Sequence, residues 1–108
     1  MIQVVLFESS NGRSPFKDWI ESINDIQTVA RIRARIDRLY RGTWGDFKAL
    51  GDEIFEMRFY FGSGYRVYFG KKGKEIVILL TGGDKSSQSK DIAKAKVYWA
   101  AYKNNKET

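Results

Sequence analysis

Three consecutive segments between residues 54 and 81 constrain the fold of this chain more than any other feature. They read "IFEMRFY" (54–60), "YRVYF" (65–69) and "EIVILLT" (75–81), and the turns "FGSG" (61–64) and "GKKGK" (70–74) separate them. The first two alternate between faces, as strands with one buried side do, and the third is apolar on both sides, as an inner strand is. Because short glycine-containing turns join them, the three segments are predicted to form an antiparallel meander.

Further elements surround this meander. In chain order we expect a strand at 2–7, a helix capped by Ser14 with Pro15 in its first turn that ends near Ser22, a helix capped by Asn24 that Gly42 stops after Arg41, the three strands, and a helix from about Ser87 to Tyr102. Residues 42–53 are predicted to be a loop, and the last six residues to fray. The order β-α-α-β-β-β-α, in one domain spanning 1–108, predicts an α+β fold with the helices packed on one face of an antiparallel sheet.

The elbow "TGGDKSSQ" (81–88) connects the last strand to the last helix. Gly82 and Gly83 permit tight backbone geometry, and Ser86 or Ser87 is expected to cap the helix. The spacing of a nucleotide-binding P-loop is absent, so the elbow is predicted to be a capped turn.

Composition removes several kinds of chemistry. The chain has no histidine and no cysteine, which excludes imidazole and thiolate ligands, disulfides and cysteine nucleophiles. Any acid–base chemistry must use Glu, Asp, Lys, Arg or Tyr, and we expect neither a metal nor another cofactor. The formal net charge of +6 favours an anionic partner such as nucleic acid or an acidic protein. Because no signal peptide or apolar run of membrane-spanning length is evident, a cytoplasmic location without a membrane partner is expected.

The predicted meander brings three charged side chains together. Glu56 and Arg58 are two residues apart on one strand and point the same way, and Arg66 on the next strand can face the same side. Two guanidinium forks suit phosphate oxygens, and a neighbouring carboxylate could accept a proton. The alternative is a cross-strand set of salt bridges without function.

Other basic and aromatic residues adjoin this set. Lys48 precedes the first meander strand, and Lys85 follows the last one beside Asp84. With the two arginines, these lysines would make a basic concavity. Aromatic side chains that could stack on RNA bases are Trp44, Tyr60 and Tyr68. Basic residues interleaved with aromatics favour single-stranded RNA over duplex DNA, although each aromatic could equally be ordinary core packing.

A basic stripe lies along the second predicted helix. Arg31, Arg35 and Arg38 recur at helical spacing. The stripe is either a solvated face or a docking surface for RNA or an acidic partner.

Together, "EIFEMRFYFGSGYRVYF", the apolar strand and "TGGDKSSQSKDIAKA" resemble the RelE/ParE superfamily of type II toxins. The element Trp44–Leu50 and the arginine-rich "ARIRARIDRL" are similar to its HigB-like branch of addiction module killer proteins. The resemblance implies a curved antiparallel sheet and a ribosome-dependent endoribonuclease that cleaves mRNA in the decoding site. It also implies a cognate antitoxin, which the stripe Arg31, Arg35 and Arg38 would bind through an acidic, partly disordered segment.

The resemblance also implies site residues. Arg66 matches the arginine that contacts the scissile phosphate, Arg58 matches a basic position on the preceding strand, and Lys85 or Asp84 matches the end of the last strand. Lys48 lies where some relatives have a polar catalytic residue. In the reaction that we expect, Glu56, or failing that Asp84, would accept the 2′ proton, and Lys85 or Lys48 would assist the leaving oxygen. Many relatives use a C-terminal tyrosine or a histidine, which this chain lacks at that place. Two alternatives therefore stay open: a ParE-like toxin that inhibits DNA gyrase, and a basic RNA- or protein-binding module without catalysis.

Overall fold

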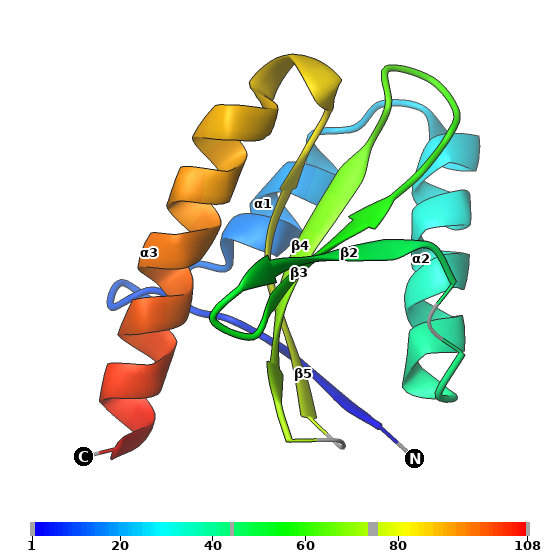
Figure 1. Cartoon of the computed structure of the whole chain (residues 1–108). Coiled ribbons are helices and arrows are strands. Elements are labelled where there is room, and N and C mark those ends of the chain that lie inside the picture. Colours follow the sequence, from blue (N-terminus) through cyan, green and yellow to red (C-terminus); the bar gives the residue numbers. More distant parts are fainter. Residues whose placement is uncertain (1, 44, 74–75, 108) are drawn as a thin grey trace.

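The computed structural model describes residues 2–43, 45–73 and 76–107. The chain has an α+β fold, with a five-stranded mixed sheet and three α-helices in the described residues (Figure 1). In chain order the elements are β1 (Gln3–Leu6), α1 (Pro15–Glu21), α2 (Ile26–Tyr40), β2 (Phe47–Gly51), β3 (Ile54–Arg58), β4 (Arg66–Lys72), β5 (Ile76–Gly83), the short 3-10 turn η1 (Lys85–Ser87) and α3 (Gln88–Glu107).

The strands lie in the order β1-β5-β4-β3-β2. The meander β3-β4-β5 is confirmed. The segment that is apolar on both sides is the inner strand β5, which pairs with β1 on one edge and with β4 on the other. The prediction of a wholly antiparallel sheet is wrong, because β1 pairs with β5 in parallel. Strand β4 also runs on to Lys72 through the predicted turn at residues 70–74.

The loop predicted at residues 42–53 contains the edge strand β2. Phe47 packs edge-on against Phe55 of β3, with ring centroids 5.7 Å apart. The hairpin between the two strands turns at Asp52 and Glu53, whose φ angles are 54° and 64°. Two left-handed residues make a tight hairpin turn, but the sequence Asp-Glu lacks the glycine that usually marks one. This unusual pair explains why the strand was not predicted.

Helices cover both faces of the sheet, contrary to the prediction of one covered face. Helices α1 and α2 pack with residues such as Met57 and Val67 in one core. Helix α3 packs on the opposite face, where Trp99 and Ala95 meet Tyr68. Figure 1 shows α3 and α2 on opposite sides of the strands. The face predicted to be open is therefore partly covered, and its charged residues lie beside the start of α3.

The helix ends agree with the sequence at one position and differ at others. Ser14 caps α1 as predicted, since its hydroxyl accepts from the backbone N–H of Lys17 at 3.1 Å. Asp25 rather than Asn24 caps α2, accepting from the N–H of Gln27 at 3.1 Å. Helix α3 continues to residue 107, beyond the predicted end at Tyr102. Within the described ranges, no helix combines the length and the apolar character that crossing a membrane requires.

Candidate functional site: a basic cavity beside the β3-β4 hairpin

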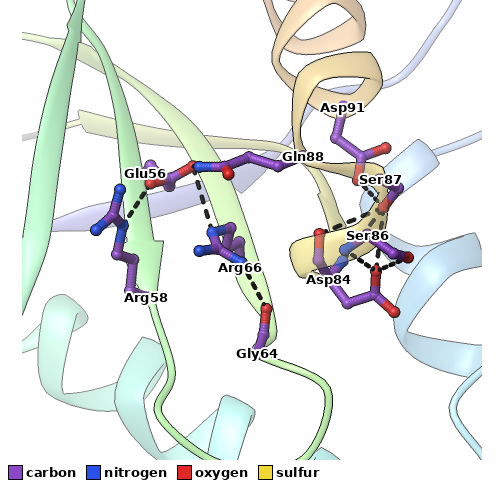
Figure 2. Close-up of polar contacts among 9 residues, drawn as sticks. All are labelled: Glu56, Arg58, Gly64, Arg66, Asp84, Ser86, Ser87, Gln88 and Asp91. Atoms are coloured by element: carbon purple, nitrogen blue, oxygen red, sulfur yellow. Dashed lines mark hydrogen bonds and ion pairs between the residues drawn. The ribbon is translucent and has the colours of Figure 1, made fainter.

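A buried glutamate joins two arginines on neighbouring strands (Figure 2). Arg58 and Arg66 lie directly opposite each other in the register of β3 and β4. Glu56 accepts a hydrogen bond from Nε of Arg58 at 2.7 Å, and its other oxygen lies 3.6 Å from Nε of Arg66. The predicted convergence of these three side chains is confirmed.

Glu56 is fully buried, with no exposed surface. Its Oε2 also accepts a hydrogen bond from the side-chain amide of Gln88 at 2.9 Å. Burial on its own raises the pKa of the Glu56 carboxyl, but the hydrogen bonds from Arg58 and Gln88 outweigh burial and lower this pKa below its usual value. The carboxylate therefore stays ionised and is a weak base. Its contacts favour a role in positioning the two guanidinium groups.

The two arginines line a cavity of about 330 Å³. We call it the arginine cavity. Its lining residues are Arg58, Phe59, Tyr60, Phe61, Gly62, Gly64, Arg66 and Lys85. Of the predicted site residues, it thus brings together Arg58, Arg66, Lys85 and Tyr60. A hydrogen bond of 3.2 Å from the backbone N–H of Lys85 to the carbonyl of Ser63 holds the elbow against the hairpin loop.

Arg66 is more deeply buried than Arg58. Its Nη1 donates to the carbonyl of Gly64 at 2.9 Å, and its side chain is 12% exposed. Arg58 is 30% exposed. With Lys85, the cavity presents three cations and, in the part of the chain described, no carboxylate. Such a lining can bind a phosphate group and stabilise negative charge that develops on it.

Asp84 does not line the arginine cavity. Its carboxylate caps η1, accepting from the N–H of Ser86 at 3.0 Å and from its hydroxyl at 2.6 Å. The hydrogen bond from the Ser86 side chain lowers the pKa of Asp84 despite partial burial. The expectation that Ser86 or Ser87 caps the last helix is corrected: η1 precedes α3, and Asp84 caps η1 in a capping box with Ser87. Asp84 instead lines a neighbouring cavity.

The residues predicted to contact RNA lie in different environments. Tyr68 is fully buried in the core beneath α3, so its prediction as a stacking surface is wrong. Tyr60 is 78% exposed and lines the arginine cavity. Lys48 is exposed on β2 opposite Glu56 but does not line that cavity. Trp44 lies outside the described residues.

The basic stripe on α2 is divided by its contacts. Arg35 donates to the backbone carbonyls of Arg58 and of Asp46, the latter at 2.6 Å, and its guanidinium lies 4.7 Å from the centre of the Phe59 ring. Arg35 therefore ties α2 to the strand that carries the site. Arg31 and Arg38 are exposed, and these two are left as candidates for partner binding.

Sequence analysis did not identify Gln88 as a site residue. It lies at the first position of α3 and reaches Glu56, 32 residues away in sequence. The position of Gln88 just after the elbow indicates a role only when α3 is known to lie on the same face of the sheet as Glu56. The sequence does not show on which face α3 lies.

An uncharacterized protein of Haemophilus influenzae is 48% identical to this chain over 82 residues. The alignment covers 76% of this chain and 83% of the relative. This chain belongs to the family of that Haemophilus protein. Comparison with models of known protein families gave no match.

Proposed function

We propose that the chain is the toxin of a type II toxin–antitoxin system, with a RelE/ParE-like fold and metal-independent endoribonuclease activity on mRNA at the ribosome. One observation carries the proposal: Arg58 and Arg66 lie opposite each other and tied to buried Glu56, in a cavity that also contains Lys85. The meander and the motifs around it support the resemblance to the superfamily. The net charge of +6 suits an RNA substrate.

The proposed reaction is an internal phosphoryl transfer. The RNA 2′ oxygen forms a bond to the adjacent phosphorus while the bond to the 5′ oxygen breaks, which leaves a 2′,3′-cyclic phosphate and a 5′-hydroxyl. Arg66 and Arg58 hold the phosphate and stabilise its developing charge. Lys85 donates a proton to the leaving 5′ oxygen.

The 2′ proton passes to solvent in this scheme. Glu56 is buried and Asp84 lies outside the arginine cavity, so neither is assigned the role of base. Because the cavity supplies charge more than proton transfer, alignment of the RNA by the ribosome supplies much of the remaining acceleration.

Neutralisation by an antitoxin is part of the proposal. Arg31 and Arg38, both exposed on α2, would bind an acidic and partly disordered segment of the antitoxin. Arg35 is omitted from this surface because its guanidinium is bound to backbone carbonyls.

The test is mRNA cleavage with translating ribosomes, comparing wild type with Arg66→Ala. Arg33→Ala is the matched control, since Arg33 is exposed on α2 away from the arginine cavity. We expect cleavage by wild type and by the control, and at least a hundredfold loss for Arg66→Ala, as for other groups that stabilise transition-state charge. Equal cleavage by all three proteins, or none by wild type, would refute the nuclease proposal.

The absence of a carboxylate from the described lining of the arginine cavity favours one rival, binding without chemistry. Growth arrest with intact mRNA and inhibited supercoiling by gyrase would support a ParE-like toxin. Salt-sensitive RNA binding without growth arrest would support a binding module.

A further inference from the structure

A second cavity, of about 340 Å³, adjoins the arginine cavity. We call it the aspartate cavity. Its lining residues are Pro15, Trp19, Tyr65, Thr81, Gly82, Gly83, Asp84, Ser87, Asp91, Lys94 and Tyr98. No described residue lines both cavities, but residues of the two linings are neighbours in the chain. Tyr65 of the aspartate cavity lies between Gly64 and Arg66 of the arginine cavity, and Asp84 precedes Lys85.

Asp91 is the unusual residue of this second cavity. It is only 6% exposed. Its Oδ2 accepts a hydrogen bond from the Ser87 hydroxyl at 2.5 Å, and no cation lies within ion-pair distance in the described ranges. Buried carboxylates are normally paired with a cation or fully hydrogen-bonded. Asp91 therefore offers an acceptor to a ligand that enters the cavity.

Asp91 is also held in a fixed position. A Cβ atom added to Gly83 would come within 1.8 Å of its Oδ2, so the carboxylate packs directly on the glycine backbone. Figure 2 shows Asp91 and Ser87 on the elbow side of Arg66 and Gly64. The acceptor is thus preorganised beside the phosphate-binding residues.

Aromatic rings form the apolar part of the lining. Trp19 and Tyr65 meet edge-on with ring centroids 6.4 Å apart, and Tyr98 stacks on Phe7 at 5.3 Å. A Cβ atom on Gly82 would come within 2.2 Å of the Trp19 ring, so the indole lies flat against the strand. Fixed rings beside a carboxylate suit a flat ligand with N–H donors.

We propose that the aspartate cavity binds an RNA base that carries an exocyclic amino group, next to the phosphate held by Arg58 and Arg66. This inference rests on the proposed function, because it takes RNA as the substrate. Asp91 accepts the amino group, as carboxylates do from cytosine, and the rings contact the face of the base. Lys94 at the exposed edge of the cavity adds a cation for the neighbouring phosphate.

A base fits the observations better than a basic protein side chain. The carboxylate cavity adjoins a cavity with three cations. A nucleotide presents a phosphate and a donor-bearing ring next to each other, whereas a Lys or Arg side chain would be repelled by the adjacent arginines.

The first test measures binding of cytidine, adenosine, guanosine and uridine 5′-monophosphates to the full chain by NMR titration. We expect uridine monophosphate, which has no amino group, to bind about tenfold more weakly than the best of the other three. The variant Asp91→Asn keeps the shape and can still accept from Ser87, and it should lose this preference. Asp52→Asn is the matched control, because Asp52 is an exposed turn residue remote from the cavity whose positive φ suits asparagine.

The second test compares cleavage. Asp91→Asn should still cleave mRNA but with relaxed base preference, whereas Arg66→Ala should not cleave. Equal binding of all four nucleotides by wild type, or an unchanged preference in Asp91→Asn, would overturn the inference even where Arg66-dependent cleavage upholds the proposed function. Changes in the NMR chemical shifts of Asp91 that lysine amide induces and no nucleotide induces would also overturn the inference, in favour of a basic protein partner.

Discussion

Replacing Glu56 by glutamine removes the charge that holds both arginines in place. The carboxylate is fully buried, 2.7 Å from Arg58 and 3.6 Å from Arg66. Removing one partner of a buried ion pair costs about 3–5 kcal/mol. Arg58 is 30% exposed and can regain water, whereas Arg66 is 12% exposed and cannot. We therefore expect the free energy of unfolding to fall by about 3 kcal/mol, at the lower end of that range.

This loss should depend on pH in a defined direction. The lowered pKa of Glu56 means that the ionised carboxylate stabilises the folded state fully above the pKa of the unfolded chain, about 4.3. The stabilisation is lost as the pH falls through the lower pKa of the folded state. The gap between wild type and Glu56→Gln should therefore be constant from about pH 5 to pH 7 and narrow below about pH 4.

The assay is urea unfolding of both proteins between pH 7 and pH 3, with Glu21→Gln as the control because Glu21 is exposed at the end of α1. In a separate thermal-unfolding experiment at pH 7, the midpoint temperature should fall by about 12 °C for Glu56→Gln. If Glu56→Gln unfolds within 0.5 kcal/mol of wild type at neutral pH, on the order of an ordinary surface change, the buried carboxylate does not hold the site together. A gap that persists unchanged at pH 3 would show that packing, not charge, causes the loss.

Three further outcomes are expected. Arg66→Lys keeps the positive charge but loses the planar guanidinium that contacts both Glu56 and Gly64. RNA cleavage should therefore fall at least about tenfold while the circular dichroism spectrum is retained. Unchanged cleavage would show that charge alone suffices. Arg35→Ala removes two hydrogen bonds to backbone carbonyls and a ring contact. The free energy of unfolding should therefore fall by about 2 kcal/mol, whereas replacing the exposed Arg38 by alanine should change it by less than about 0.5 kcal/mol. Tyr60→Ala should weaken binding of single-stranded RNA about tenfold without a change in stability, because the ring is 78% exposed beside the arginine cavity; equal affinity would remove Tyr60 from the RNA surface.

Local sequence patterns were sufficient to predict the meander and the convergence of Glu56, Arg58 and Arg66. Alternation along β3 and β4, together with the length of the loop between them, determines which side chains face the same way. The same information could not predict β2, because its turn uses Asp52 and Glu53 in left-handed conformations. Nor could it show that β1 pairs in parallel with β5, which depends on contacts between distant parts of the chain.

Burial of polar residues was the harder part to predict. Tyr68 was expected to stack on RNA because it shares a face with Arg66, but helix α3 covers that end of the face. Asp84 was expected beside the cleavage site, but as the first polar residue after β5 it caps η1 instead. In both cases the deciding fact was the position of α3, which its sequence predicts as a helix without showing which face of the sheet it covers.

The position of α3 also explains why so many polar groups can be buried at this end of the sheet. Gln88 and Asp91, one helical turn apart, lie above Glu56 and Tyr68. Burial, followed by the charge of Glu56, raises the pKa of Tyr68, so its hydroxyl keeps its proton between two carboxylates. Arg58 and Arg66 offset the negative charge of Glu56 on the same face of the sheet. Because Gln88 and Asp91 both belong to the first turn of α3, the position of this helix decides which polar side chains are buried beside Glu56 and Tyr68.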